Sequence, residues 1–362
     1  MAREKCGRLK FCWMAVLLIS AAVLLFTSFG RAVVESVTSS CKLVISIDGE
    51  AQCLRLHNSR HTDHHIHNHS HHVVDAIYTW VNPTDPDWRR KRRDALGSTF
   101  GNSGADDLSD ARRFNNGKWP DAELCASLDL LLVNMPWIRY VWILTARPQR
   151  PACAHPRMRI VHHDEVGLPA TFNSGSIETS VHLIPGLSAR FVYLNDDFYV
   201  LRPMPASAFF AVDGRPIVWT EPFKLDHIFR TCVHTCAATN KLVRPLLRGK
   251  SMLHLLHAPR ALTVAMLNAT ASLPSLARAV RETKYLHLTR RDDDFLVMNA
   301  AQNLAVAGGA ALLSTAVPTF RMVDGAPPAP FHRNVDIACV NGAVLGTAAD
   351  IARLRASLRL KP

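Results

Sequence analysis

The sequence lacks a second long apolar segment and is short of acidic residues. After residue 30 no uncharged run approaches the length of the first one, which excludes a protein that crosses a membrane many times. Asp and Glu number 30 against 42 Lys and Arg, and the net charge of +12 suits an anionic ligand such as a nucleotide. The usual nucleic-acid-binding motifs are missing too, so no nucleic-acid partner is expected. At 48% hydrophobic and 20% charged residues, the composition is that of a globular protein.

The one long apolar run, FCWMAVLLISAAVLLFTSFG at 11–30, predicts a transmembrane helix. Basic residues outnumber the single acidic one in 1–10, so the positive-inside rule predicts a cytoplasmic tail there and a type II signal anchor at 11–30. A cleaved signal peptide is the alternative, although its apolar core is usually only about 7–15 residues long. The membrane is therefore an expected partner, and the rest of the chain is expected in the Golgi lumen, with a bacterial inner membrane as the alternative location.

Residues 31–72 have the composition of a polar, His-rich stem. Eight histidines fall within 57–72, and imidazoles at that density can bind zinc or copper. Because no defined ligand spacing accompanies them, we favour a stem that cannot bury a core. The glycosylation sequons at Asn68 and Asn268 become relevant only if the chain crosses a secretory membrane.

Seven cysteines lie beyond the anchor, where an oxidising lumen would favour disulfides. Cys41 with Cys53 is one plausible pair, although the sequence does not give the connectivity. Cys232 and Cys236 have a CxxxC spacing among histidines, but this spacing matches no standard zinc finger, so a zinc site is the less favoured interpretation.

From residue 73 onward, strand-like and helix-like segments alternate. Apolar runs rich in β-branched and aromatic residues predict strands at 73–81, 138–146, 157–166 and 189–195. Helical spacing of apolar residues predicts helices at 121–137 and 173–186. Asp85 is expected to cap a further helix whose first turn holds Pro86. This alternation predicts an α/β fold with a mostly parallel sheet flanked by helices.

Polar residues follow three of the predicted strands. In open α/β sheets the ligand sits beyond the carboxyl ends of the strands, which is where these residues would gather. Adjacent carboxylates suit a metal ion and a phosphate, but Asn and Asp are also ordinary turn formers, so both interpretations stay open on this pattern alone. The three groups are Asn82 with Asp85, Thr145, and Asn195-Asp196-Asp197.

Four groups of motifs stand out within residues 73–345. They are DAIYTWVNPTDPDW at 75–88; the stretch from RFNN at 113–116 to FVYLNDDFYV at 191–200; NKLVRPLL, HAP and TRRDDDF at 240–247, 257–259 and 289–295; and DIACVNG at 336–342. In this order they resemble the four conserved regions of the Stealth family of hexose-1-phosphate transferases, which includes the catalytic subunit of GlcNAc-1-phosphotransferase and capsular polysaccharide phosphotransferases. The resemblance implies one catalytic domain at 73–345, followed by a helix or tail at 346–362.

The resemblance implies a Rossmann-like, nucleotide-sugar-transferase-like fold and a particular reaction. A sugar-1-phosphate would pass from a nucleotide sugar (UDP-hexose, UDP-GlcNAc or GDP-mannose) to a hydroxyl of a glycan acceptor, and a nucleoside monophosphate would leave. Mg²⁺ or Mn²⁺ would neutralise the diphosphate of the donor, held by Asp196 and Asp197. The oligomeric state is left open.

The remaining roles that the resemblance implies fall on catalytic and nucleotide-binding residues. His257 and Asp197 are the candidates for the general base, and Arg290 or its neighbour Arg291 would meet the charge that develops on the transferred phosphate. Asp294 would orient that arginine or complete the metal shell, and it can also cap the helix expected after it. The residues expected to bind the donor are Trp80, Asn82, Asp85, Arg113, Glu178 and His182.

Two features of these motifs leave the function open. Glu178 and His182 lie four residues apart in the expected helix at 173–186, hence on one face, and a simple helix-surface pair accounts for them equally well. Cys125 stands where the family usually has an arginine after Glu-Leu, so a phosphate or acceptor contact would be lost and activity reduced or altered. A metal-dependent type II glycosyltransferase and an inactive glycan-binding relative are therefore the alternative functions. The short segment between the second and third regions favours a glycan acceptor over a protein.

Overall fold

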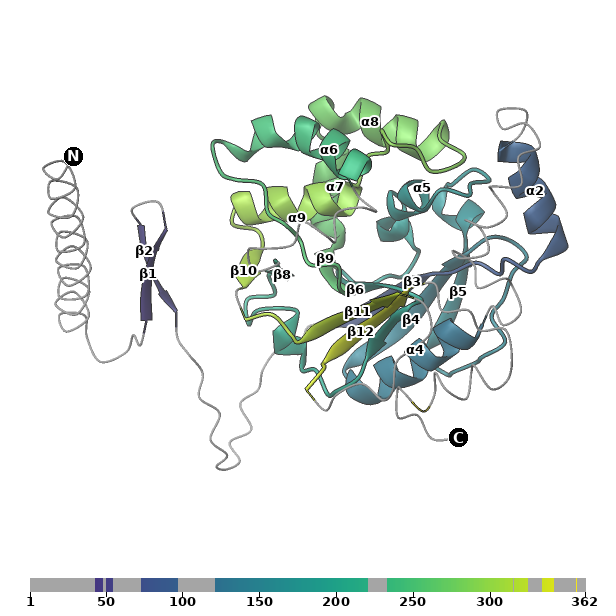
Figure 1. Cartoon of the computed structure of the whole chain (residues 1–362), viewed down its shortest axis with the longest axis horizontal. Helices are drawn as coiled ribbons and strands as arrows, with labels where there is room; N and C mark the ends of the chain where they lie inside the picture. The colour runs from purple at the N-terminus through teal and green to yellow at the C-terminus, as the bar shows by residue number, and fades with distance from the viewer. Residues whose placement is uncertain are drawn as a thin grey trace, which may run out of the picture. The chain divides into compact units, whose positions relative to one another are not determined.

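The central sheet is built from the apolar runs that the sequence predicts as strands. The computed structural model describes residues 43–47, 50–54, 73–96, 121–220, 233–314, 316–324, 334–341 and 356. Among these, five strands form one sheet in the order β5-β4-β3-β6-β9 (Figure 1). Strands β3 to β6 run parallel to one another, whereas β9 is antiparallel to β6. Their bounds are β3 Val74–Thr79, β4 Ile138–Thr145, β5 Met158–His162, β6 Arg190–Asn195 and β9 Arg260–Thr263.

Both faces of this sheet are buried. Successive side chains of a strand point to opposite faces, and on β3 the residues Ala76 and Tyr78 belong to one apolar cluster while Ile77 between them belongs to another. On β6, Leu194 and Tyr193 divide in the same way. A sheet covered on both faces needs apolar residues at consecutive positions, which explains why its strands read as continuous apolar runs.

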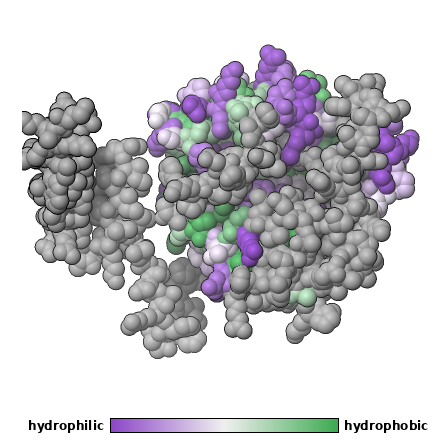
Figure 2. Space-filling view, viewed as in Figure 1, coloured by the Kyte–Doolittle hydropathy of each residue, from purple (hydrophilic) through white to green (hydrophobic). Residues whose placement is uncertain are grey.

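Helices supply the two covering layers. Figure 1 shows α4 on one side of the sheet and α6, α7, α8 and α9 grouped on the other, in agreement with the membership of the two apolar clusters. Hydrophilic side chains gather over α8 and α2 in the space-filling view (Figure 2). The helices are α2 Pro86–Leu96, α4 Ala122–Asn134, α5 Ser174–Glu178, α6 Val233–Val243, α7 Val264–Ala271, α8 Pro274–Tyr285 and α9 Val297–Ala307.

Short strands and turns complete the described residues. One small sheet has the order β11-β12-β7, a second pairs β10 with β8, and β1 pairs with β2. In the first of these, β12 runs antiparallel to β7 and sets Cys339 opposite Phe198. The bounds are β1 Leu43–Ile47, β2 Glu50–Leu54, β7 Phe198–Val200, β8 Ile217–Trp219, β10 Leu312–Ser314, β11 Phe320–Asp324 and β12 Ile337–Asn341, with single turns of helix at η3 His163–Val166, η4 Val181–Leu183, η5 Ala206–Ala208 and η7 Arg244–Leu247.

The predicted α/β class and mostly parallel sheet are confirmed, and so is the cap of α2, where Asp85 Oδ1 accepts from the N–H groups of Asp87 and Trp88 at 2.9 and 3.0 Å. The single helix expected at 173–186 is wrong. The chain forms α5 and then η4 instead, because the hydroxyl of Thr179 donates to the carbonyl of Ser176 at 2.6 Å and competes with helical bonding.

The N-terminal cap of α9 is also not the one expected. Leu296 occupies the cap position, and Asp294 lies two residues before it with its carboxylate engaged elsewhere, so the prediction that Asp294 caps this helix is wrong.

Several predictions lie outside the described residues. They are the tail at 1–10, the anchor at 11–30, the His-rich part of the stem at 57–72, Cys41, Arg113, Cys232 and nearly all of 346–362. Within the stem range, the described part is the antiparallel pair β1–β2. Among the described residues no helix is both long and apolar enough to span a bilayer.

Candidate active site

The order of the parallel strands reverses between β3 and β6. Chain order runs β3, β4, β5 toward one edge of the sheet, and β6 then returns to the other side of β3. Such a reversal opens a crevice beyond the carboxyl ends of the two strands that flank it, and ligands of open α/β sheets bind there. Thr79 at the end of β3 pairs with Asn195 at the end of β6, so Asp196 and Asp197 follow directly at this crevice.

The two carboxylates of this crevice are poorly supplied with hydrogen-bond donors. Burial, followed by the charge of Asp197, raises the pKa of Asp196 to about 7. Burial likewise raises the pKa of Asp197 to about 6, against the opposing effect of a hydrogen bond from the Cys339 thiol at 3.3 Å. The other oxygen of Asp197, Oδ1, is buried without a partner among the described residues.

This donor set fits a divalent cation that also binds substrate. The described residues contain no group of three His, Cys, Asp or Glu side chains able to hold a metal. Mg²⁺, however, is usually held by only one or two carboxylates, together with substrate phosphates and water. Such a cation would coordinate the buried Oδ1 of Asp197. Its positive charge would also favour the ionised form of both carboxyls, whose pKa values are raised without it.

His257 reaches the same edge of the sheet from the opposite direction. Because β9 is antiparallel to β6 and sets Arg260 opposite Tyr193, the residues before β9 lie near the carboxyl end of β6. The His257 ring packs on Phe198, next to Asp197 in the chain, with ring centroids 5.1 Å apart. Burial, then the positive charges of Arg260 and Arg290, lowers the pKa of His257 to about 4. The imidazole is therefore neutral at pH 7 and able to accept a proton.

Glu178 belongs to a network that the sequence did not reveal. The Tyr193 hydroxyl donates to Glu178 Oε1 at 3.3 Å and lies 3.0 Å from Thr79 Oγ1. Burial raises the pKa of Glu178, while the charges of Arg260 and Arg290 oppose that rise. Arg260 follows the HAP motif directly, and this proximity is the one sequence signal that could have identified it.

The structure separates His182 from Glu178. His182 lies in η4 rather than in α5, and its ring is buried, which lowers its pKa to about 4. Its hydrogen-bond partner is Asn268 on α7, and Lys284 contributes a neighbouring charge. The two residues therefore do not share the helix face on which the sequence placed them.

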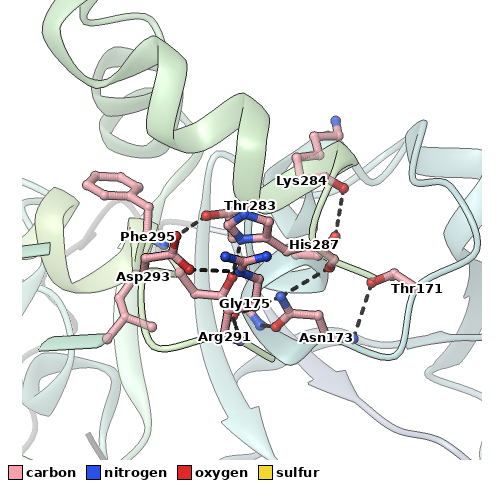
Figure 3. A network of polar contacts seen from close by, with 12 residues as sticks. Thr171, Asn173, Gly175, Thr283, Lys284, His287, Arg291, Asp293 and Phe295 are labelled. Carbon is pink, nitrogen blue, oxygen red and sulfur yellow. Dashed lines mark hydrogen bonds and ion pairs between the residues drawn. The ribbon is translucent and has the colours of Figure 1, made fainter. Parts of the chain in front are cut away.

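Asp294 is the centre of a polar network that joins two loops (Figure 3). Its Oδ2 accepts from Asn173 Nδ2 at 2.8 Å and from the N–H of Arg291 at 2.9 Å, and its Oδ1 accepts from His287 Nδ1 at 2.7 Å. The hydroxyl of Ser176 donates to the carbonyl of Lys284 at 2.9 Å across the same boundary. Oδ2 of Asp294 thus ties the loop before α9 to the start of α5, and Oδ1 braces the same loop internally through His287.

This network carries Arg290 to the site. Arg290 Nη2 donates to Ser174 Oγ at 2.9 Å, and its positive charge acts on both Glu178 and His257. Arg291 instead pairs with Asp293 at 2.9 Å on the surface. Of the two arginines proposed from the sequence, Arg290 is the one that the fold brings to the other candidates.

The turn after β3 is held by side-chain amides. Gln149 clamps the backbone of Asn82, accepting from its N–H at 2.7 Å and donating to its carbonyl at 2.9 Å. Asn82 Oδ1 accepts from the N–H and the hydroxyl of Thr84. Trp80 is buried in the core, and Asp85 caps α2. This turn is consequently a fixed wall at the carboxyl end of β3.

Cys125 has a structural partner. It forms a disulfide with Cys153 that ties the first turn of α4 to the segment after β4. Cys125, which stands where the family usually has an arginine, therefore forms a covalent cross-link in this chain.

Comparison with known proteins agrees with the motifs. The family model for Stealth protein conserved region 1 matches residues 72–99, and that for conserved region 2 matches residues 120–218. The chain therefore contains two of the conserved regions of Stealth proteins. These two regions hold β3, the turn after it, α4, α5 and the Asp196–Asp197 pair. The third and fourth regions, expected at 240–295 and 336–342, stay predictions.

Three relatives of this protein show how far the likeness extends. An exopolysaccharide phosphotransferase of Streptomyces coelicolor is 39% identical over 41% of this chain and 25% of its own length. The capsular polysaccharide phosphotransferases LcbA of Aeromonas hydrophila and fcs1 of Haemophilus influenzae are 37% and 33% identical, over 39% and 43% of this chain and the same shares of their own lengths. The chain thus covers less than half of each of these relatives.

A likeness in structure extends further but is weak. The galactosyltransferase LgtC aligns over 80% of this chain and 97% of its own with a TM-score of 0.39 and 10% identity. At these values the likeness says nothing about the reaction.

Proposed function

We propose that this protein transfers a sugar-1-phosphate from a nucleotide sugar to a hydroxyl of a glycan, forming a phosphodiester. The observation that supports it most is the pair of half-buried, donor-poor carboxylates, Asp196 and Asp197, at the strand-order reversal. The names of the relatives, which are capsular and exopolysaccharide phosphotransferases, support a glycan acceptor.

The proposed reaction is a displacement at the sugar-bearing phosphorus. The acceptor oxygen forms a bond to that phosphorus, the bond from it to the bridging oxygen breaks, and a nucleoside monophosphate leaves. The proton of the acceptor hydroxyl passes to a base on the protein. We assign this base to His257, because Asp197 is needed elsewhere and the His257 imidazole is neutral at pH 7.

Asp196 and Asp197 would hold the cation, Mg²⁺ or Mn²⁺. When bound, it supplies positive charge to the diphosphate of the donor. Arg290 provides a second positive charge from the loop fixed by Asp294, and guanidinium groups suit phosphate oxygens. Glu178, which accepts from Tyr193 and lies near the charge of Arg260, would accept hydrogen bonds from the sugar or ribose of the donor.

The Rossmann-like arrangement supports a nucleotide donor, since such sheets bind nucleotides at the point of strand reversal. UDP-hexose, UDP-GlcNAc and GDP-mannose are the donors to be tried. The Cys125–Cys153 disulfide supports a catalytic body on the oxidising side of a membrane, such as the Golgi lumen, reached through the anchor predicted at 11–30.

A donor panel tests the proposal. The purified chain is incubated with each nucleotide sugar, Mg²⁺ or Mn²⁺ and a set of glycans, and the nucleotide products are separated by chromatography. The proposal expects a nucleoside monophosphate together with a glycan whose mass has grown by one sugar phosphate. Release of a nucleoside diphosphate with a glycosidic product would make the protein a conventional glycosyltransferase. Turnover of no donor would favour a glycan-binding role.

A further inference from the structure

Asn173 stands at the junction between the two segments that carry Glu178 and Arg290. Glu178 is the last residue of α5, which begins directly after Asn173. Arg290 lies in the segment between α8 and α9, and its Nη2 donates to the hydroxyl of Ser174, the first residue of α5, at 2.9 Å. Asn173 is fully buried, so its side chain can act on the site only through its neighbours.

The side-chain amide of Asn173 bonds to both segments at once. Its Oδ1 accepts from the N–H of Gly175 at 2.9 Å and so caps the N-terminus of α5. Its Nδ2 donates to Asp294 Oδ2 at 2.8 Å and to the carbonyl of His287 at 3.2 Å (Figure 3). One side of the amide therefore fixes α5, and the other side fixes the segment between α8 and α9.

This set of bonds requires a neutral amide. An amide offers an acceptor and two donors on one short side chain, and Asn173 uses all three. A carboxylate in its place would meet Asp294 with like charge. The packing is close as well, because a Cβ at Gly175 would stand 3.2 Å from Asn173 Oδ1 and 3.6 Å from Asp294 Oδ2. The glycine thus lets the start of α5 approach both side chains.

Further hydrogen bonds hold the two segments side by side. The N–H of Phe172 donates to the carbonyl of Leu288 at 2.8 Å, and the hydroxyl of Ser176 donates to the carbonyl of Lys284 at 2.9 Å. Both of these bonds end on backbone carbonyls, which any residue supplies. The link to Asp294 differs, because it depends on two particular side chains.

We propose that Asn173 is a positioning residue that sets the Arg290 guanidinium relative to Glu178 at the active site. The inference rests on the proposed function, in which Arg290 meets charge on the transferred phosphate and Glu178 accepts from the donor. A cation that stabilises a transition state must be in place before the reaction, and a displacement of about 1 Å can cost about a hundredfold in rate. Asn173 acts through α5 and Asp294 and needs no contact with the substrate.

The first test separates the two sides of the amide. Asn173→Asp keeps an acceptor for the cap of α5, since aspartate caps helices as well as asparagine does, but it loses both donors and sets like charge against Asp294. With an accepted nucleotide sugar, we expect the turnover rate to fall about a hundredfold while KM for the donor changes less than about threefold, because Arg290 acts on the transition state.

A second variant guards against misfolding. Asn173→Ser is neutral and also keeps a capping oxygen, but its hydroxyl is too short to bridge to Asp294. Its turnover rate should fall in the same direction as that of Asn173→Asp. Thermal unfolding of each variant shows the temperature range in which it is folded, and rates are compared only there.

A double-mutant cycle shows whether Asn173 acts through Arg290. In an Arg290→Ala background, or Arg290→Lys where the alanine variant is too slow to measure, the further loss from Asn173→Asp should shrink to less than about threefold. The reason is that the guanidinium that Asn173 positions is then absent. A residue that only stabilises the fold would lower turnover by the same factor in both backgrounds.

Asn303→Asp is the matched control. Asn303 is a buried amide on α9 that also accepts on one side and donates on the other, with Oδ1 2.7 Å from the N–H of Leu253 and Nδ2 2.9 Å from the carbonyl of Asn299. The same substitution again keeps an acceptor and loses a donor. Because these bonds lead neither to α5 nor to the segment that carries Arg290, turnover should stay within about threefold of the wild type.

The outcomes separate this inference from the proposed function. Near-normal turnover in Asn173→Asp, or an equal loss in the Arg290 background, overturns the positioning role and leaves the proposed function standing. A glycosidic product in the wild type overturns the proposed function alone, because the cycle measures turnover whichever bond forms. Wild-type protein that turns over no donor overturns both.

Discussion

Asp75 and the Asp196–Asp197 pair lie at opposite ends of the paired strands β3 and β6. At the amino end of β3, Asp75 is fully buried and accepts from Arg139 at 2.9 and 2.7 Å, from Trp142 Nε1 at 2.9 Å and from the N–H of Ser188 at 2.9 Å. At the carboxyl end of β6, Asp197 accepts one weak bond from a thiol, and its other oxygen has no partner among the described residues.

The two ends respond to burial in opposite ways. Burial works to raise the pKa of Asp75, but the hydrogen bonds from Arg139 and Trp142 outweigh it and leave that pKa lowered. At Asp196 and Asp197 burial prevails and the pKa is raised. A carboxylate whose donors are all supplied by the protein stabilises the fold, whereas one left short of donors is prepared for a ligand.

The largest effect expected from this contrast is on activity. Asp197→Ala should lower the turnover rate at least about a thousandfold, because the cation that it holds contributes several kcal/mol to charge stabilisation. The same variant should unfold at the wild-type temperature or above, since it removes a desolvated carboxylate. Steady-state rates and thermal unfolding measure the two effects. Near-normal turnover would remove Asp197 from the site.

Asp75→Ala should have the opposite profile. It leaves Arg139 without its partner, and we expect a loss of about 3 kcal/mol in the free energy of unfolding, at the low end for a broken buried pair because the Arg139 side chain is 38% exposed. Urea unfolding gives this value. At temperatures where the variant is folded, its KM and turnover rate should be near those of the wild type. A stable but inactive Asp75→Ala variant would contradict the assignment of Asp75 to stability and of Asp197 to turnover.

The Cys125–Cys153 disulfide is a further structural feature, which joins α4 in the covering layer to the segment after β4. Replacing Cys125 and Cys153 together with alanine should lower the free energy of unfolding by about 2–4 kcal/mol, because the bond closes a segment with a sequence separation of 28. Turnover should be retained. If Cys125 instead takes over the role of the family arginine in binding phosphate, the double variant will bind the donor more weakly at unchanged stability.

The smallest effect concerns pH. The folded pKa of Asp75 lies below its unfolded value, so the stability that it contributes is complete above the unfolded pKa and is lost as the pH falls through the folded one. Unfolding free energies measured between pH 5 and 2 should fall more steeply for the wild type than for Asp75→Asn. Parallel curves would mean that Asp75 is not held as an ion.

Much of this contrast was visible in the sequence, but unevenly. The runs at 73–81 and 189–195 predicted β3 and β6 because a doubly covered strand must be apolar throughout. The placement of Asp196 and Asp197 at the carboxyl end of β6 followed from the same pattern. Local sequence therefore placed the candidate carboxylate pair at the carboxyl end of a parallel strand, and its role stays a prediction.

The partners of the site residues were not visible, because they come from distant segments. Asp294 bonds to Asn173, and Cys125 bonds to Cys153, and no local pattern encodes either pairing. Arg260 was passed over for the same reason. The helix expected at 173–186 failed because hydroxyl side chains compete for backbone carbonyls, a choice that periodicity of apolar residues does not register.

The destination of the sugar-bearing phosphorus tests the central claim most directly. A nucleotide sugar labelled with ³²P at that phosphate is incubated with the full chain, Mg²⁺ and an accepted glycan, and the label is followed by chromatography. The account predicts that the label moves to the glycan in the wild type, and that no label moves in Asp197→Ala. Label that remains on a released nucleoside diphosphate would contradict it.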